Sequence, residues 1–415
     1  MKDKLLMLAI LPLLLGACVK SDKTGPTSVD KFVSINGVDL IQPDGTKLFI
    51  KGTNLGNWLN PEGYMFKFSK TNSARFINEM FCQMVGPDFT AEFWQKFKDN
   101  YITREDIAFI KRTGSNTIRL PFHYKSFTDE DYMGLTVNQD GFARVDSVVK
   151  WCREEGLYLI LDMHDAPGGQ TGDNIDDSYG YPWLFESKMS QDLYCEIWQR
   201  IAEYYKDEPV ILGYELFNEP IAPYFEDMEV LNGKLEEVYK RGVEAIREVD
   251  TNHIILLGGA QWNSNFAPLK DSTFDDKIMY TCHRYGGEPT KEAIMNFINF
   301  RDRVNLPMYM GEIGHNSNEW MSSFCQTMEE NNIGWTFWPY KKADGSCFAG
   351  IVPPENWNVV VTFSEAPRGT YKEIRDARPD QNIARKAMDD FIEACKFKNC
   401  IVQEGYIGAL GLKTK

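Results

Sequence analysis

Polar and aromatic side chains that could carry out acid–base or covalent chemistry stand where short apolar runs of this sequence end. They are Arg119, His164-Asp165, Asn218-Glu219, His283 with Tyr285, Glu312 and Trp338, at six of eight such runs. Ionisable residues at the ends of apolar strands can simply be solvated caps. Their recurrence at most of the ends instead indicates one shared site, if the fold brings these ends together.

Two of these residues, Glu219 and Glu312, form a candidate pair of carboxylates. Cleavage of an acetal requires one carboxylic acid that protonates the leaving oxygen and a second carboxylate at the anomeric carbon. A carboxylate beside an arginine stays charged, whereas a carboxyl group in a drier setting has a raised pKa and can donate a proton. Two glutamates together with Arg119 therefore fit glycoside hydrolysis.

The elements that must position these residues are short apolar runs alternating with longer amphipathic ones. The runs predict strands at 48–53, 115–120, 157–162, 211–217, 253–258, 278–282, 307–311 and 333–338. Helical patterns occupy part of 91–112, then 142–155, 190–206, 229–249, 290–304, 318–331 and 381–396. Apolar strands followed by helices indicate a parallel sheet, and eight such units predict an α/β fold, a (β/α)8 TIM barrel with its active site at the strand ends. A doubly wound sheet is the alternative, but no glycine-rich phosphate turn supports it.

We expect residues 31–415 to form this single catalytic domain. Segment 31–40 is expected to plug or pair at the bottom of the barrel, and 339–380 to form a long loop near the active face. Trp335 lies inside a predicted strand and is expected in the core. Trp183 and Trp262 follow strands and could stack on sugars.

Several of these motifs resemble glycoside hydrolase family five, the cellulase family of clan A. Leu216-Phe217-Asn218-Glu219-Pro220 resembles its Asn-Glu-Pro signature, and Gly311-Glu312-Ile313-Gly314 resembles its strand-seven nucleophile motif. The other recurrent positions of the family are matched in order by Arg119, His164, His283 with Tyr285, and Trp338.

The resemblance implies a role for each matching residue. Glu219 would be the general acid/base and Glu312 the nucleophile of a retaining double displacement. Asn218 would hold the sugar 2-hydroxyl, and Arg119 would lie near Glu312 and Asn218. By the same resemblance, Tyr285 would donate a hydrogen bond to Glu312, and His283 would position Glu219 or the sugar. His164 would bind a sugar hydroxyl, and Trp338 would form the floor of the subsite.

A second resemblance narrows the substrate to β-glucan chain ends. Residues 55–62 (LGNWLNPE) resemble the Leu-Gly-Gly-Trp-Leu-x-x-Glu stretch of exo-β-1,3-glucanases, whose glutamate, here Glu62, closes the pocket at the non-reducing end. Residues 163–170 (MHDAPGGQ) resemble their His-x-Ala-Pro-Gly-Ser-Gln segment. The chain departs from these enzymes at Asn57, Pro61 and His123 and in the acidic loop 173–177, so the linkage stays open.

Residues 1–17 resemble the signal peptide of a bacterial lipoprotein. Lys2 and Lys4 precede an apolar run too short to span a bilayer, and Leu15-Gly16-Ala17-Cys18 resembles a lipobox. This resemblance implies export, lipidation of Cys18 and contact with a membrane, expected to be the outer membrane, through the lipid anchor only. Residues 18–30 are expected to form a flexible tether. An ordinary secretory peptide is the alternative.

Composition argues against other partners and cofactors. With 45 Lys+Arg against 60 Asp+Glu the net charge is −15, which disfavours nucleic acid and suits a neutral β-linked glucan. Five histidines and no Cys-x-x-Cys argue against zinc. Asp173, Asp176 and Asp177 could bind calcium, but their loop lacks the EF-hand spacing. We therefore expect no metal and no cofactor. Cys395 and Cys400, the one closely spaced cysteine pair, could form a disulfide.

Three functions are open on the sequence alone. The favoured one is a retaining β-glycoside hydrolase acting on β-glucan ends or β-glucosides. An endo-β-1,4-glucanase or related hemicellulase would have an open groove in place of a pocket closed by Glu62. A non-catalytic carbohydrate-binding lipoprotein would have lost one catalytic carboxylate, and the sequence retains both Glu219 and Glu312.

Overall fold

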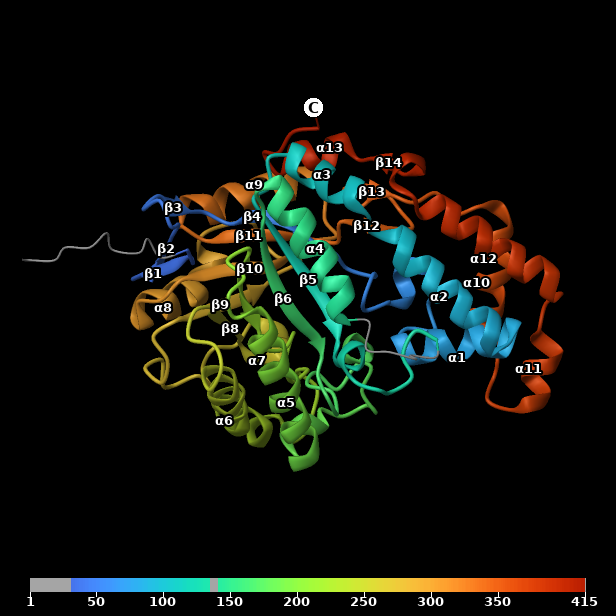
Figure 1. Cartoon of the computed structure of the whole chain (residues 1–415), viewed down its shortest axis with the longest axis horizontal. Coiled ribbons are helices and arrows are strands. Elements are labelled where there is room, and N and C mark those ends of the chain that lie inside the picture. The colour runs from blue at the N-terminus through green and yellow to red at the C-terminus, as the bar shows by residue number, and fades with distance from the viewer. Residues whose placement is uncertain (1–30, 135–140, 415) are drawn as a thin grey trace, which may run out of the picture. The chain divides into compact units, whose positions relative to one another are not determined.

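The computed structural model describes residues 31–134 and 141–414. Its centre is a closed barrel of parallel strands in the order β10-β11-β4-β5-β6-β7-β8-β9 (Figure 1). The strands are β4 (Lys51–Asn54), β5 (Thr117–His123), β6 (Tyr158–Asp165), β7 (Ile211–Glu215), β8 (Ile254–Gly258), β9 (Ile278–His283), β10 (Met308–Gly314) and β11 (Gly334–Trp338). Each lies at one of the eight predicted runs, so the predicted (β/α)8 barrel is confirmed.

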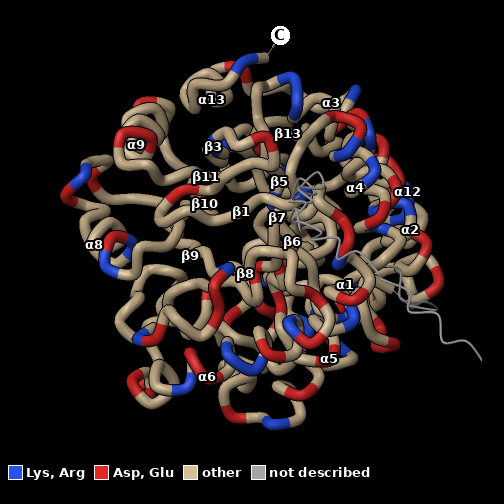
Figure 2. The backbone as a smooth tube through the Cα atoms, turned by 60° about the vertical axis from the view of Figure 1, so that its left-hand side comes forward, with Lys and Arg blue, Asp and Glu red and all other residues tan. Residues whose placement is uncertain are grey.

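Closure of the barrel brings the carboxyl ends of all eight strands to one face. The last strand pairs in parallel with the first, with Trp335 opposite Lys51 and Phe337 opposite Thr53. Charged side chains gather on the outer helices, whereas the strands are mostly uncharged (Figure 2). This distribution follows from burial of the sheet on both faces, which leaves the helices to meet water.

Helices follow the strands, and α2 to α6, α8, α9 and α12 lie at or near the predicted ranges, whereas the other helices were not predicted. They are α1 (Ala74–Val85), α2 (Pro87–Tyr101), α3 (Arg104–Arg112), α4 (Gly141–Glu155), α5 (Lys188–Tyr205), α6 (Met228–Arg247), α7 (Ala260–Asn263), α8 (Met295–Val304), α9 (Asn318–Glu330), α10 (Asn358–Glu365), α11 (Tyr371–Ala377), α12 (Gln381–Cys395) and α13 (Glu404–Ala409). The pattern at 91–112 is two helices, because Thr103 is extended and forms a capping box with Asp106 that starts α3.

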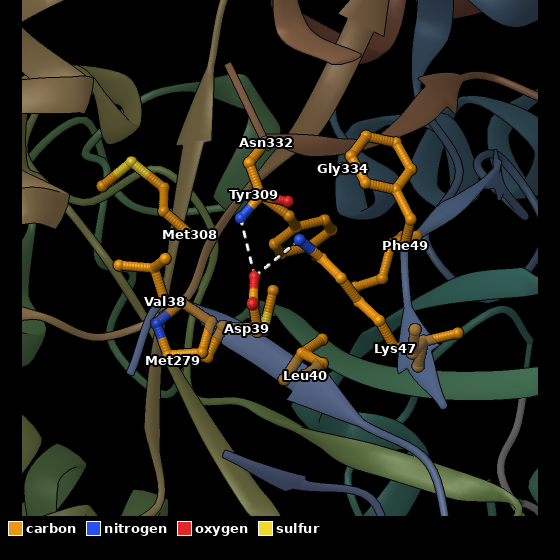
Figure 3. A pocket seen from close by; sticks show the side chains of 13 residues that line it. Val38, Asp39, Leu40, Lys47, Phe49, Met279, Met308, Tyr309, Asn332 and Gly334 are labelled. Carbon is orange, nitrogen blue, oxygen red and sulfur yellow. Dashed lines mark hydrogen bonds and ion pairs between the residues drawn. The ribbon is translucent and has the colours of Figure 1, made fainter. Parts of the chain in front are cut away.

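The N-terminal segment closes the bottom of the barrel, as expected. Strands β1 (Ser34–Asn36), β2 (Asp39–Ile41) and β3 (Lys47–Leu48) form a small antiparallel sheet. It buries Val33, Leu40 and Leu48 against interior residues of the barrel, namely Ile160, Leu212, Ile254, Met279 and Tyr309. Beside it lies a cavity of about 20 Å³, where Asp39 accepts a hydrogen bond from Asn332 and pairs with Lys47 (Figure 3). That volume is about the size of one water, so this end offers no room for a substrate.

The prediction of a loop over 339–380 is wrong. The stretch contains α10, α11 and two short strands, β12 (Lys341–Lys342) and β13 (Ala349–Gly350), and β13 pairs with β14 (Ile401–Val402). The sequence also did not predict α1, which packs with α12 against α2, and α10 packs against α1 and α12 (Figure 1). They enclose an aromatic cluster that includes Phe66, Phe68, Trp94, Trp357 and Phe391. These short helices are stabilised by partners distant in sequence, which local periodicity does not reveal.

A buried ion pair links α3 to β12, the short strand that follows the last barrel strand. Lys341 and Asp106 are both fully buried, and their Nζ and Oδ1 atoms lie 2.5 Å apart. Lys341 also donates to the backbone carbonyls of Tyr101 and Cys395, and Asp106 accepts from the hydroxyl of Tyr340. Both charges are therefore hydrogen-bonded as well as paired, the condition under which burial of charge is tolerated.

The cysteines of the described residues are all free thiols, including Cys395 and Cys400. The disulfide considered for that pair is thus absent from this structure. Cys18 and the expected tether 18–30 lie outside the described residues. Within residues 31–134 and 141–414, no helix is both long and apolar enough to cross a membrane.

Removal of Lys341 tests the importance of the buried pair. Lys341→Met leaves Asp106 buried without its counter-charge, so we expect the free energy of unfolding to fall by about 3–5 kcal/mol in urea titrations. Lys372→Met is the matched control, because Lys372 forms an exposed pair with Asp376 on α11; it should change stability by less than about 0.5 kcal/mol. Equal effects of the two substitutions would contradict this account.

Candidate active site

A cavity of about 400 Å³ opens at the carboxyl ends of the barrel strands. Its lining is Glu62, Tyr64, His164, Ile175, Asn218, Glu219, Tyr285, Glu312, His315 and Trp338. Seven of the nine candidate catalytic and substrate-binding residues are in this lining. The other two, Arg119 and His283, lie directly behind it and contact Glu312 and Glu219.

Arg119, on β5, is the centre of the polar network beneath the cavity. Its side chain is fully buried, and Nε and Nη2 donate to the two carboxylate oxygens of Glu215, at 2.9 and 2.6 Å. Nη1 donates to Glu312 at 2.8 Å, and Nη2 also donates to Asn218 Oδ1 at 2.8 Å. A third carboxylate, that of Asp162, lies 3.0 Å from Nη2. Nearby carboxylates outweigh burial here and raise the pKa of Arg119 well above its usual value, so the guanidinium is a permanent cation.

Glu312, near the end of β10, has both carboxylate oxygens engaged. Oε1 accepts from Arg119, and Oε2 accepts from the hydroxyl of Tyr285. Tyr285 belongs to the segment that follows β9, so residues from two other barrel strands or their ends fix this one carboxylate. Two donors, one of them charged, therefore fix the orientation of this carboxylate.

Glu219 lies in a different setting, without a cationic partner. Its Oε1 is 2.8 Å from His283 Nδ1, and His283 Nε2 is 3.1 Å from the amide nitrogen of Asn263. Because Asn263 donates to Nε2, the proton of the neutral ring is on Nδ1 and points at Glu219. Burial lowers the pKa of His283 to about 4 and raises the pKa of Glu219 to about 7. Glu219 can therefore hold a proton near neutral pH.

The segment that presents Glu219 adopts an unusual backbone. Glu219 has φ 46° and Ile221 has φ 58°, in the left-handed region that a β-branched residue rarely adopts. The side chain of Gln170 donates to the carbonyl of Asn218 at 2.7 Å, and the hydroxyl of Thr171 donates to that of Glu219 at 2.7 Å. These contacts hold the strained segment, a feature that recurs at functional sites.

His164 and Trp338 form a stacked pair at one wall of the cavity. Their rings are nearly parallel, at 3°, with centroids 5.2 Å apart. His164 Nδ1 lies 2.7 Å from Asp162 and Nε2 lies 3.3 Å from the Asn218 amide, which fixes the ring. Burial raises the pKa of Asp162 to about 7 and lowers that of His164 to about 4, although Arg119 stands beside Asp162.

Glu62 contributes an unpaired polar atom to the cavity. The residue is only 4% exposed, and its Oε1 has no hydrogen-bond partner within the described residues. Burial, followed by the charges of Glu312 and Glu219, raises the pKa of Glu62 well above its usual value. A carboxyl group that holds its proton can both donate and accept, which suits a pair of sugar hydroxyls.

Two departures from the exo-glucanase pattern pack against each other. His123 Nε2 lies 3.4 Å from Asp177 of the acidic loop, and the main-chain N–H of Arg75 donates to the same carboxylate. Asp176 accepts from the main-chain N–H groups of Thr171, Gly172 and Ser178. Hydrogen-bond donors, which would repel a cation, thus surround these oxygens. This arrangement indicates that Asp176 and Asp177 hold the loop in place and disfavours calcium binding.

Glu219, His283 and Glu312 are also the residues of the described chain that come closest to a metal-binding set. One ligand atom from each lies within 4.8 Å of the others. A cation between them would sit against the Glu312 carboxylate, whose two oxygens already accept from Arg119 and Tyr285. The donor set therefore fits proton transfer better than it fits a resident ion.

Several residues of the site were not predicted. Glu215 and Asp162 are charged residues inside apolar strands, and that pattern alone could have marked them, since a buried charge needs a partner. Gln170 was quoted only as part of a motif. Tyr64, in a short 3-10 helix, and His315, directly after β10, also line the cavity, and no local pattern in the sequence marks them.

Comparison with known proteins agrees with this geometry. The sequence profile described as Cellulase (glycosyl hydrolase family 5) matches residues 51–344. The β-xylosidase of Phanerodontia chrysosporium is 32% identical over 256 residues, covering 61% of this chain and 52% of the xylosidase. Endoglucanase C of Acetivibrio thermocellus is 27% identical over 317 residues, covering 61% and 88%. Glucan 1,3-β-glucosidase of Kluyveromyces lactis is 28% identical over 247 residues, covering 55% and 53%. The chain thus spans about half the length of two of these relatives.

Solved structures share the fold. The crystal structure of a β-glucanase from Saccharophagus degradans superposes with a TM-score of 0.53 at 18% identity, covering 88% of this chain and 94% of that one. The family profile covers more than half of the chain, in the region that holds the barrel and the paired glutamates. The chain therefore belongs to glycosyl hydrolase family 5, the cellulase family, and is an O-glycosyl hydrolase.

Proposed function

We propose that the protein is a retaining β-glycoside hydrolase that cleaves β-glucan chain ends or β-glucosides by double displacement. The observation that carries the proposal is the spacing of the two glutamates. A carboxylate oxygen of Glu219 lies within 4.8 Å of one of Glu312. Retaining glycosidases place their carboxyl groups about 5–5.5 Å apart, whereas inverting ones need about 6.5–9.5 Å to admit a water.

Glu312 is the proposed nucleophile. Its contacts with Arg119 and Tyr285 hold the carboxylate in one orientation, facing the cavity. Attack on the anomeric carbon forms a glycosyl ester and neutralises this carboxylate. Arg119 remains paired with Glu215 throughout, so it does not lose its partner when Glu312 reacts.

Glu219 is the proposed general acid/base. Because its pKa is raised, the Glu219 carboxyl group holds a proton, which it donates to the leaving oxygen in the first step. After the aglycone departs, the same group accepts a proton from the water that hydrolyses the glycosyl ester. The His283 Nδ1 proton stabilises the carboxylate that exists between the two steps.

The remaining residues of the cavity bind the sugar. Asn218 is fixed by Arg119 through its Oδ1, which leaves the amide to face the 2-hydroxyl. The Trp338 ring, held by His164 and by its hydrogen bond to the Tyr64 hydroxyl at 2.7 Å, is a rigid platform for the sugar face.

Glu62 supports action at chain ends. An internal sugar has one outer hydroxyl tied up in a linkage, so it would leave the buried Glu62 carboxyl group unsatisfied and would clash with it. The second candidate is an endo-β-glucanase, which the similarity to endoglucanase C favours. We also propose, from the lipobox resemblance alone, that Cys18 carries the lipid that anchors the exported protein.

Glutamine variants of the two carboxylates test their roles. Glu312→Gln should show no turnover on any substrate, because no glycosyl ester can form. Glu219→Gln should lose about 10²–10⁴-fold on substrates with poor leaving groups but keep its first step on activated aryl glycosides. Stopped-flow release of the aryl group measures that step. The matched control Glu203→Gln, on the exposed face of α5, should behave as wild type. The reverse pattern would exchange the two roles.

The pH profile tests the protonation state of Glu219. Because the acid must be protonated, kcat/KM for a poor leaving group should fall as pH rises through about 7, the raised pKa of Glu219. With an activated aryl glycoside the alkaline limb should weaken, and in Glu219→Gln it should vanish. An alkaline limb near pH 7 that persists in Glu219→Gln would assign it to another group.

Product analysis on polymeric β-glucans tests action at chain ends. The wild type should release single sugars with slow loss of viscosity. Glu62→Ala should lower kcat/KM on terminal glucosides about tenfold or more, since two hydrogen bonds of about 1 kcal/mol each are lost. Glu62→Gln keeps a donor and an acceptor and should lose less. Rapid loss of viscosity with mixed oligosaccharides from the wild type would favour the endo alternative.

A further inference from the structure

A second cavity, of about 480 Å³, lies on the other side of the wall that closes the active site. Ile175 of the acidic loop faces the active-site cavity, whereas its neighbours Asp173 and Asn174 line the second one. In another part of the wall, the N–H of Gly63, the residue after Glu62, donates a hydrogen bond to the carbonyl of Asn72. Asn72 also lines the second cavity. The two cavities thus share one thin partition.

Two exposed aromatic rings form one side of the second cavity. Tyr179 is 72% exposed and Phe76 is 47% exposed, and the Arg75 guanidinium lies between them, 4.7 and 4.8 Å from their centroids. Arg75 itself is fixed by a hydrogen bond to the carbonyl of Ser178 and lies 3.8 Å from the Asp177 carboxylate. The guanidinium covers the inner faces of the rings and orders them, while much of their surface stays open to solvent.

The composition of this cavity matches a saccharide. Flat rings offer large contact area to the apolar face of a sugar at low cost in side-chain entropy. Short polar side chains around them, those of Asn72, Ser73, Asn174 and Ser178, can exchange hydrogen bonds with hydroxyl groups. A few convergent polar groups beside apolar surface is the pattern of small-molecule sites. The charge of Arg75 is balanced by Asp177, so the cavity does not require an anionic ligand.

Two residues of the acidic loop, by which this chain departs from the exo-glucanase pattern, line part of the cavity, namely Asp173 and Asn174. His123 and Asp177 pack against each other, and Asp176 holds the loop through three main-chain N–H groups. Ser178 and Tyr179, which directly follow the acidic loop, also line the second cavity. The contacts that hold the acidic loop therefore also hold one side of a concave surface beside the catalytic pocket.

We propose that this second cavity binds a saccharide unit of the substrate, outside the sugar that is cleaved. The proposal rests on the proposed glycosidase function and adds a specificity site to it. The unit is either a branch on the molecule being cleaved or part of a neighbouring glucan chain. A linear continuation of the cleaved chain is excluded by the partition at Glu62. In either case the cavity increases the affinity for complex substrates and leaves the chemical step unchanged.

Kinetics of Tyr179→Ala and Phe76→Ala test the proposal. On polymeric β-glucan or on branched gluco-oligosaccharides, KM should rise about tenfold, the effect of losing about 1.4 kcal/mol of binding free energy. On 4-nitrophenyl β-glucoside, which reaches only the catalytic pocket, kcat and KM should stay at wild-type values. Tyr371→Ala is the matched control, because Tyr371 is 82% exposed on α11, outside the lining of the second cavity.

The substrates distinguish the two sources of the saccharide. A raised KM for branched oligosaccharides assigns the cavity to a branch, and an increase confined to the polymer assigns it to a neighbouring chain. Affinity electrophoresis in gels that contain the polymer should show weaker retardation of both variants. Unchanged KM and retardation on every substrate would overturn this inference and leave the proposed function standing. Failure of the wild type to cleave any β-glycoside would instead overturn the proposed function.

Discussion

The site depends on a single buried cation. Arg119 is fully enclosed and is shared among the carboxylates of Glu215, Asp162 and Glu312. A buried charge persists only where paired and hydrogen-bonded groups replace water. Glu215 supplies the bidentate partner, and Tyr309 donates to Glu215 at 2.8 Å from the far side of the barrel interior. The barrel core therefore fixes the guanidinium, and the guanidinium fixes Glu312 and Asn218.

The position of Arg119 also gives the two glutamates different surroundings. Glu312 lies against the cation and accepts hydrogen bonds from Arg119 and Tyr285, whereas Glu219 lies against a neutral imidazole and has its pKa raised to about 7 by burial. The group that can hold a proton is the candidate acid, and the group fixed beside the cation is the candidate nucleophile. The left-handed backbone at Glu219 belongs to this arrangement, because it directs the carboxyl group across the cavity toward Glu312.

Much of the barrel and its candidate site could be predicted from local patterns. Each barrel strand is a short apolar run, and Glu219, Glu312, Arg119 and His283 stand at run ends, where a parallel barrel must gather them. The helix α12 was predicted, but α1 and α10 and their packing with it were not, because the aromatic residues of this block pack with partners distant in sequence. Tyr64 and His315 reach the cavity from connections that follow β4 and β10, whose paths depend on tertiary contacts. Glu215 and Asp162 could have been recognised as charged residues within apolar strands, but their common partner is visible only in three dimensions.

The central claim is that Glu219 and Glu312 act by double displacement, through a glycosyl ester on Glu312. Proton NMR of the reaction mixture, recorded before mutarotation equilibrates the released sugar, tests it most directly. The account predicts that the first product formed from a β-glycoside is the β-anomer, since two inversions restore the starting configuration. The α-anomer as first product would show a single inversion and contradict the proposed mechanism.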